Sequence, residues 1–209
     1  MANITAAVVK ELRDKTGLPM MECKRALEES GGDIEQAIEI LRKAGQKVMA
    51  KRADRETAFG RIGVFTDEAN NVTALVELLC ESAPVAKNDE FTAMADELAR
   101  QLAEGPGAGS VDELLSQNSP VEPSKTLQDR LGEVINRIRE KFVVNRILRV
   151  EGACGVYLHH DGSKAAVVEV KGDDVGLARE IAMHVVAMRP IALKPEDLPA
   201  ELVAKEREV

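Results

Sequence analysis

The hydrophobic period changes once along the chain, and this change limits the fold more than any other feature. Through residue 45 the apolar side chains recur at the spacing of amphipathic helices, whereas from Arg61 they gather in short β-rich runs. Helices and strands that are separated in this way are typical of α+β proteins. The sequence therefore predicts an N-terminal helical module, followed by two related α/β subdomains in which helices pack on short antiparallel sheets.

Residues 1–45 divide into three short helices with recognisable ends. Asn3 or Thr5 can cap the first helix, and Gly17 supplies a left-handed stop. Gly31-Gly32 end the second helix, and Asp33 caps the third. Each helix carries an apolar stripe that the others can cover. The stripes are Val8, Val9 and Leu12; Cys23, Ala26 and Leu27; and Ile34, Ala37, Ile38 and Leu41.

A basic segment follows, which we interpret as a helical linker over residues 46–59. Within residues 42–55 the only acid is Asp54, against the cations Arg42, Lys43, Lys47, Lys51, Arg52 and Arg55. A basic run is usually a solvated surface, so we favour the interpretation that this segment is a solvated extension of the third helix. The alternative is a docking strip for an acidic partner, which would act through exposed and salt-sensitive charges.

The remaining sequence contains the pattern of a β-hairpin followed by a helix twice, at 61–103 and 155–188. The turn-like segment DEANN separates the β-rich runs of the first copy, and Asp161-Gly162 is the hairpin signal of the second. A further helix is expected at about 124–145. In the first copy the predicted inner face of the helix is Phe91, Met94, Ala95, Leu98 and Leu102. In the second copy Leu177, Ile181, His184 and Val185 recur at helical spacing.

These patterns predict four parts along the chain. They are a three-helix module at 1–45, the basic linker at 46–59, a first core subdomain with a helical insertion at 60–145, and a second core subdomain at 146–209. The last part is expected to end within a helix, because the tail KPEDLPAELVAKEREV has a helical start.

No motif of catalytic or metal chemistry stands out, since the sequence lacks GxxxxGK[ST], GxSxG, HExxH and CxxC. His159 and His160 are adjacent, so in a strand they would point to opposite faces and could not readily share a metal. His184 lies on an apolar helix, where a partly buried histidine with a hydrogen-bond partner is the favoured interpretation. We therefore expect a protein that is not an enzyme and needs no metal or cofactor.

Composition argues against several classes of partner. The net charge is −8 and aromatic residues are 2% of the chain, so direct nucleic-acid binding lacks both a positive field and stacking platforms. No apolar stretch is long enough for a bilayer, and the N-terminus lacks the features of a secretory signal. Cys23, Cys80 and Cys154 are far apart and odd in number, which favours a reduced, cytoplasmic setting.

Two small features suggest recognition of a protein. Met20 and Met21 start the second helix, and one of them should face outward if Cys23 faces inward. An exposed methionine is an adaptable contact, whereas a buried one fills the core, and the sequence leaves both interpretations open. Lys10 and Arg13 lie three residues apart on the first helix, where they can contact a partner or simply be solvated.

The segment ELRDKTGLPMMECKRALEESGGDIEQAIEILRKAG, residues 11–45, closely resembles the N-terminal module of the bacterial elongation factor Ts family. That family's pattern runs ELRxxTGxxMMxCKxAL and then GDIExAIExLRxxG. The resemblance continues in the family's order over nearly the whole chain. Its blocks are LCESAPVAKNDEF (79–91), LGEVINRIREKFVVNR (131–146), GVYLHHDGSKAAVVEV (155–170) and IAMHVVAMRPIALKPEDLPAELVAKEREV (181–209).

The resemblance implies a fold and a function. The module should have a ubiquitin-associated three-helix fold. The family binds elongation factor Tu, a translational GTPase, in its GDP-bound and nucleotide-free forms, and speeds release of GDP by displacing the bound magnesium. The implied partner site on the module is Lys10, Arg13, Met20 and Met21, which match residues that meet the nucleotide domain of the GTPase.

Further positions carry over from the core of the family. Ser82-Ala83-Pro84-Val85 occupies the family's Thr-Asp-Phe-Val loop, whose Asp and Phe help displace magnesium. Leu131, Gly132 and His159 match core positions near the same interface. Ala83 and Pro84 therefore remove the acidic group and the aromatic ring of the loop. The favoured hypothesis is an exchange factor; the alternative is a paralogue that holds the GTPase with weak or no exchange.

A second departure concerns the end of the sequence. The chain stops at Val209, whereas many relatives continue into a helical hairpin and a C-terminal module. A fragment and a naturally short form are both compatible with this. The hairpin aids dimerisation in the longer relatives, so the resemblance leaves a monomer and a homodimer open.

Overall fold

The computed structural model describes residues 4–172 and 174–207, which form two units. The first unit ends at Val150, and the second begins at Glu151. Both units combine helices with short β-strands, and this confirms the predicted α+β fold. None of the described helices is long and apolar enough to cross a membrane.

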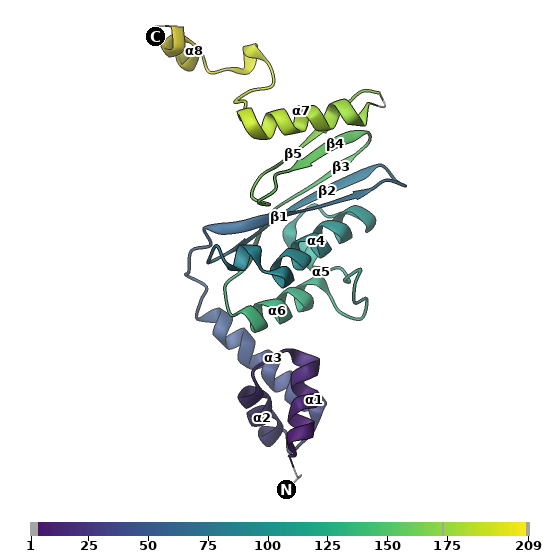
Figure 1. Ribbon diagram of the computed structural model, residues 1–209, viewed down its shortest axis with the longest axis vertical. Helices are drawn as coiled ribbons and strands as arrows, with labels where there is room; N and C mark the ends of the chain where they lie inside the picture. The colour runs from purple at the N-terminus through teal and green to yellow at the C-terminus, as the bar shows by residue number, and fades with distance from the viewer. Residues whose placement is uncertain (1–3, 173, 208–209) are drawn as a thin grey trace. The chain divides into compact units, whose positions relative to one another are not determined.

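The first unit begins with the predicted bundle of helices. The helices are α1 (Ala6–Thr16), α2 (Met20–Glu29) and α3 (Ile34–Ala50), seen at the N-terminal end in Figure 1. Thr5 and Asp33 cap α1 and α3 with their side chains, and Gly17 ends α1 with a φ of 68°. Asn3, the other predicted cap, lies outside the described residues. The predicted stripes supply the bundle's core, with Val9, Leu12, Cys23, Ala26, Leu27, Ala37 and Leu41 all buried.

Helix α3 continues beyond residue 45 into the basic segment and ends at Ala50. The hypothesis of a solvated surface is wrong for Arg52, whose side chain is only 23% exposed, whereas Arg55 is exposed as expected. Arg52 and Arg55 form ion pairs of 3.1 and 2.7 Å with the carboxylate of Glu81, whose side chain is largely buried. This partner lies at the end of a strand 26 residues or more further along the chain, so local composition gave no sign of it.

The first core sheet has the strand order β1-β2-β3, with β1 (Phe59–Asp67) and β2 (Val72–Cys80) forming the predicted hairpin. The third strand, β3 (Val143–Glu151), lies on the other side of β2. Helix α4 (Asp89–Glu104) packs on β1 and β2, and Figure 1 shows α4 and α6 on the same side of the sheet. The predicted inner face of α4 is confirmed, because Phe91, Met94, Ala95, Leu98 and Leu102 are all buried.

The predicted helix at 124–145 is shorter than expected. Helix α6 (Leu127–Ile138) ends where Arg139 adopts a left-handed conformation with a φ of 67°, and β3 begins five residues later in a run rich in β-branched residues. The short helix α5 (Val111–Ser116) precedes it. A buried carboxylate, that of Glu97, ties α4 to this region by accepting hydrogen bonds from Ser119 (2.6 Å) and Arg130 (3.3 Å).

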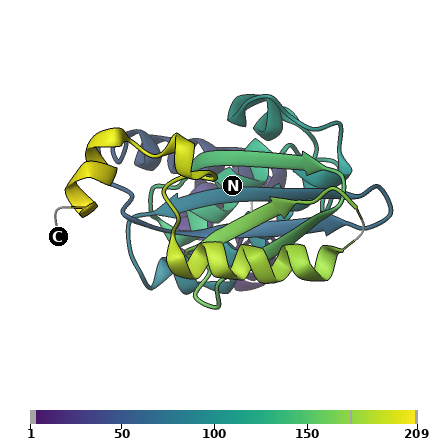
Figure 2. The ribbon, with the colours of Figure 1, turned by 90° about the horizontal axis from the view of Figure 1, so that it is seen from above.

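The second unit repeats the arrangement of a hairpin and a helix. Its elements are β4 (Cys154–Leu158), β5 (Ala165–Glu169), α7 (Val175–Met188), the short 3-10 helix η2 (Pro195–Asp197) and α8 (Ala200–Arg207). Strands β4 and β5 are antiparallel, as predicted, and α7 runs along them (Figure 2).

Helix α7 forms as its spacing predicts, but of the four residues at that spacing only Val185 is half-buried. Ala178 and Ala182 are buried, whereas Leu177, Ile181 and His184 are exposed. The physical reason is a close approach between the helix and β4. A Cβ added to Gly155 of β4 would lie 2.1 Å from the backbone nitrogen of Arg179, so only the smallest side chains of α7 fit against the strand.

The first hairpin contains the same close contact. Gly63 lies on β1 opposite Val76 of β2, and a Cβ there would lie 2.1 Å from the carbonyl oxygen of Ala95 in α4. In both copies a glycine in the first strand of the hairpin thus lets the helix backbone touch the strand. This shared contact is more direct support for the predicted internal repeat than the similar hydrophobic patterns of the two segments.

We expect alanine at Gly63 or Gly155 to destabilise the protein, because the new Cβ would press on helix backbone. Overpacking of this kind reduces the free energy of unfolding by about 1–3 kcal/mol. Gly132→Ala is the matched control. It lies inside α6 with no atom within 4 Å of its added Cβ, and it should stabilise by up to about 1 kcal/mol. Urea unfolding followed by circular dichroism measures all three. Wild-type stability in G63A and G155A would contradict the close approach.

Candidate partner-binding site

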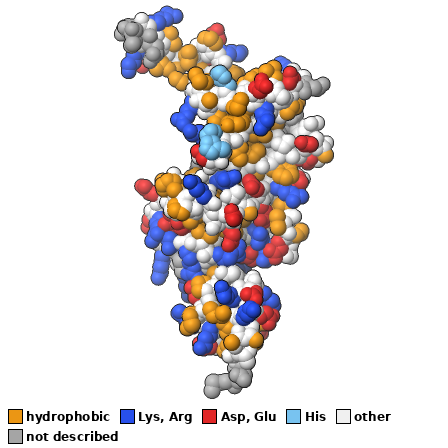
Figure 3. Space-filling model, in the orientation of Figure 1, with side chains coloured by type: hydrophobic (Ala, Val, Ile, Leu, Met, Phe, Trp, Pro, Cys, Tyr) orange, Lys and Arg blue, Asp and Glu red, His pale blue; other side chains and the backbone are white. Residues whose placement is uncertain are grey.

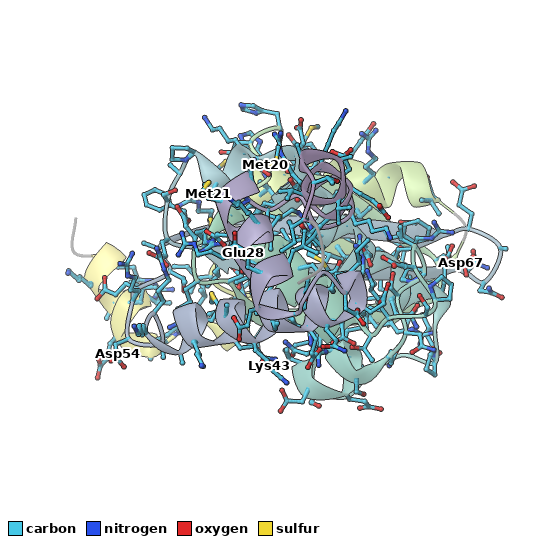
Figure 4. All side chains as sticks on the ribbon, turned by 90° about the horizontal axis from the view of Figure 1, so that it is seen from below. Met20, Met21, Glu28, Lys43, Asp54 and Asp67 are labelled. Carbon is cyan, nitrogen blue, oxygen red and sulfur yellow. The ribbon has the colours of Figure 1, made fainter. Side chains whose placement is uncertain are left out.

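Met20 and Met21 are both exposed at the start of α2, with 41% and 59% of their surface accessible. Cys23, three and two residues further on, is buried in the bundle, so the helix turns the methionines outward. Figure 4 shows the two next to each other, on the opposite side of the view from Lys43 of α3. Two adjacent exposed methionines form an apolar and flexible contact surface.

Lys10 and Arg13 lie on the exposed side of α1. Neither forms an ion pair with any residue in the described part of the chain, whereas nearby Lys15 pairs with Glu11 at 3.1 Å. Residues three apart in a helix share a face, so the two charges point to the same side. The module therefore presents two unpaired cations and two exposed methionines at neighbouring helices.

The loop at 82–85 leaves the end of β2 and enters the 3-10 helix η1 (Val85–Lys87). Ala83 and Pro84 are exposed at its tip, and Val85 packs against the buried core of the first unit. Pro84 has a helical conformation (φ −61°, ψ −39°), which suits the first residue before η1. The loop thus has an anchored base and an exposed tip that carries neither charge nor ring.

The carboxylate of Glu140 holds the base of this loop. It accepts hydrogen bonds from the backbone N–H groups of Glu81 and Ser82, both at 3.1 Å, and from the Ser82 hydroxyl at 2.6 Å. Glu140 lies in the connection between α6 and β3. Hydrogen bonds to a charged acceptor are stronger than neutral ones, so three at one carboxylate fix the loop's direction.

Glu81 is a second carboxylate at the base of this loop, and Glu81 and Glu140 are called the carboxylate pair below. It accepts hydrogen bonds from Arg52 (3.1 Å), Arg55 (2.7 Å) and the backbone N–H of Lys141 (2.6 Å). Burial by itself would raise the pKa of Glu81, but these donors, led by Arg55, outweigh it and lower the pKa to about 2. The pair therefore joins the segment after α3, the end of β2 and the start of β3 at the base of the loop.

Sequence reasoning missed the carboxylate pair. Both residues lie inside blocks that carry the family resemblance, LCESAPV and NRIREKF, and that was the only available signal. Nothing local indicates that Glu140 would reach a residue 58 positions earlier. The neighbouring Cys80 is buried, and burial raises the pKa of its thiol to about 11, so it is held as a neutral thiol that donates to the Ser82 carbonyl oxygen.

The three core positions from the resemblance lie in different surroundings. Leu131 is buried in the core of the first unit, so it can act on a partner only by positioning α6. Gly132 is exposed on α6, on the wall of a groove of about 770 Å³ between α3 and α6. His159 belongs to the second unit.

The expectation that His159 and His160 point to opposite faces of a strand is wrong. Strand β4 ends at Leu158, and the two rings meet edge to face with centroids 4.3 Å apart. The His184 side chain is exposed rather than partly buried. No group of three His, Cys, Asp or Glu residues that could hold a metal ion occurs among the described residues.

The sequence was compared with known families and proteins. Residues 84–209 match the model of the family described as elongation factor TS. Elongation factor Ts of Xanthomonas campestris pv. campestris (strain B100) is 44% identical over 207 residues, which are 99% of this chain and 69% of that protein. Elongation factor Ts of Alcanivorax borkumensis is 38% identical over 204 residues, 97% of this chain and 70% of that protein.

The lowered pKa of Glu81 predicts a pH dependence of stability. Its folded-state pKa of about 2 lies below the ordinary 4.5, so its contribution is present above pH 4.5 and is lost as the pH falls toward 2. Glu81→Gln should therefore show a smaller loss of unfolding free energy between pH 5 and about pH 3 than the wild type. Glu68→Gln, in the exposed turn after β1, controls for loss of one charge. Equal losses in wild type and E81Q would contradict the assigned role.

Proposed function

The chain belongs to the elongation factor Ts family of translation elongation factors, and we propose that it binds elongation factor Tu and promotes release of GDP. It acts on the GDP-bound form, displaces magnesium, and stays on the nucleotide-free GTPase until GTP loads. Nucleotide exchange takes place in the cytoplasm and needs no cofactor, nucleic acid or membrane. The protein performs no covalent chemistry of its own.

Thermodynamic linkage explains how such a protein works. The exchange factor and GDP each lower the other's affinity for the GTPase by the same factor. Magnesium bridges the nucleotide's phosphates and protein oxygens, so a contact that moves its ligands weakens GDP without touching it. Only a contact that is better made in the magnesium-free state can shift this equilibrium.

The observation that carries the proposal is the anchored loop at 82–85. Glu140 fixes its base through three hydrogen bonds, and Ala83 and Pro84 at its tip are exposed. A tip that is held in one direction loses little conformational entropy on contact with a partner. The exposed Met20 and Met21, with Lys10 and Arg13, supply a second contact surface on the module for the nucleotide domain.

A second function is favoured by one specific observation. Ala83 and Pro84 stand where the family has Asp and Phe, so the tip offers neither a carboxylate nor a ring to the magnesium site. Proline also lacks the backbone N–H of the residue it replaces. On this alternative the chain holds the GTPase through its other contacts and releases GDP weakly or not at all.

Release of a fluorescent GDP from the cognate elongation factor Tu tests the two functions. With magnesium and excess unlabelled GDP present, the release rate should rise with the concentration of added protein, because binding of the exchange factor weakens binding of GDP. A flat rate with measurable binding would establish the holding function instead. A flat rate with no binding by calorimetry would refute both.

Restoring the family's residues in the loop should increase exchange. Ala83→Asp with Pro84→Phe returns a carboxylate and a ring to the exposed tip, and we expect release of GDP to accelerate by about tenfold, equivalent to about 1.4 kcal/mol of barrier. The matched control is Ala69→Asp with Glu68→Phe, which adds the same groups to the exposed turn of the β1–β2 hairpin. If the loop variant exchanges no faster than this control, the tip does not limit the reaction.

A further inference from the structure

A small cavity of about 270 Å³ lies in the second unit, beside the end of β4 and the C-terminal turns of α7. Met183 and Val186 of α7 supply its apolar wall, and Tyr157, His159, Lys164 and Arg189 supply polar groups. The volume lies below the roughly 300–1,000 Å³ of ordinary small-molecule sites, so it suits one side chain rather than a nucleotide.

The two cations at this cavity have no acidic partner among the described residues. Neither the Lys164 ammonium nor the Arg189 guanidinium forms an ion pair with another residue in the portions of the chain that the structure describes. The nearby carboxylate of Asp161 is engaged by the N–H and hydroxyl of Ser163, at 2.9 and 2.8 Å. Figure 3 shows blue cationic side chains beside the pale-blue histidines of this unit. Two cations that line one cavity favour an anionic ligand.

The backbone conformation of Arg189 is a second indication that this cavity is a functional site. Arg189 follows α7 in the left-handed conformation, with φ 50° and ψ 59°, a position that glycine usually fills. A non-glycine residue there is strained, and strain of this kind is concentrated at functional sites. Arginine in place of glycine sacrifices some stability and places a guanidinium at the cavity.

Tyr157 can add a neutral donor. Its hydroxyl lies 3.3 Å from Nδ1 of His159. In the tautomer with a proton on Nδ1, His159 donates to the tyrosine oxygen, and the tyrosine O–H is then free to donate to an anion. The cavity would thus surround a carboxylate with an ammonium, a guanidinium and a hydroxyl, while Met183 and Val186 cover the carbon atoms beside it.

We propose that this cavity is a carboxylate-binding pocket that takes an acidic side chain of the GTPase, a glutamate rather than a free anion. The glutamate's methylene groups would lie against Met183 and Val186, with its carboxylate between Lys164 and Arg189. The pocket contains His159, which the family resemblance assigns to the partner interface, so it extends that interface. The identity of the occupant rests on the proposed function.

Affinity of the full chain for nucleotide-free elongation factor Tu tests the proposal. Lys164→Gln and Arg189→Gly should each weaken binding about three- to tenfold and make the affinity less dependent on salt, as loss of an interfacial charge does. Arg189→Gly should leave the melting temperature unchanged or raise it, because glycine relieves the strained φ. Weaker binding by an equally stable variant separates this role from a structural one.

Lys171→Gln is the matched control, since it removes an exposed lysine of the same unit from outside the cavity. Wild-type affinity in both pocket variants would overturn the proposal and leave the proposed function intact. Failure of the wild-type chain to bind would overturn the proposed function and the named occupant together. A direct measurement uses N-acetylglutamate amide as the probe. Saturable NMR shifts at the backbone amides of Tyr157 and His159, lost in K164Q, are expected, and their absence would overturn the pocket itself.

Discussion

The contact between a helix backbone and a glycine of the neighbouring strand determines how both hairpins are built. At Gly63 and Gly155 the helix lies so close that no Cβ fits between the two backbones. The helix must then present alanines to the strand, as α7 does with Ala178 and Ala182. Most of the buried side chains of the first unit are Leu, Val and Ala, which agrees with an aromatic content of 2%.

This constraint also explains which side chains face outward. On α7 the narrow space against β4 leaves no place for Leu177 and Ile181, so both are about half exposed. On α4 the longer sheet and α6 provide a wider space, and Phe91 meets Phe142 edge to face with centroids 4.8 Å apart. The same motif therefore yields a thick core in the first unit and a thin one in the second.

Local sequence signals predicted the local structure well. The caps at Thr5 and Asp33, the left-handed Gly17 and both hairpin turns depend on a few adjacent residues, so their residue types sufficed. The errors share a different cause. The partner of Arg52 lies 29 positions further along the chain, and the face that α7 buries depends on its close contact with Gly155; periodicity reports neither.

The candidate site also combines features that the sequence indicated with features that depend on contacts between distant segments. The resemblance identified the loop at 82–85 as a candidate contact, and the structure adds that Ala83 and Pro84 at its tip are exposed. The carboxylate pair that fixes its base could not, because Glu81 and Glu140 come together only in the folded chain. Two neighbouring carboxylates are tolerable because each has its own donors, and loss of those donors would leave a partly buried charge uncompensated.

The proposed function assigns separate consequences for nucleotide exchange to the base and the tip of the loop. Some contacts have the same strength whether or not GDP is bound to the partner, and contacts made by Met20 and Met21 would be of this kind. Such contacts strengthen the complex but leave the affinity for GDP unchanged. Only a group that competes with magnesium binding distinguishes the two states. The carboxylate pair fixes where the tip points and adds no such group. The proposed function therefore predicts that residues 83 and 84, rather than the carboxylate pair, decide whether the loop releases nucleotide or only contacts a bound partner.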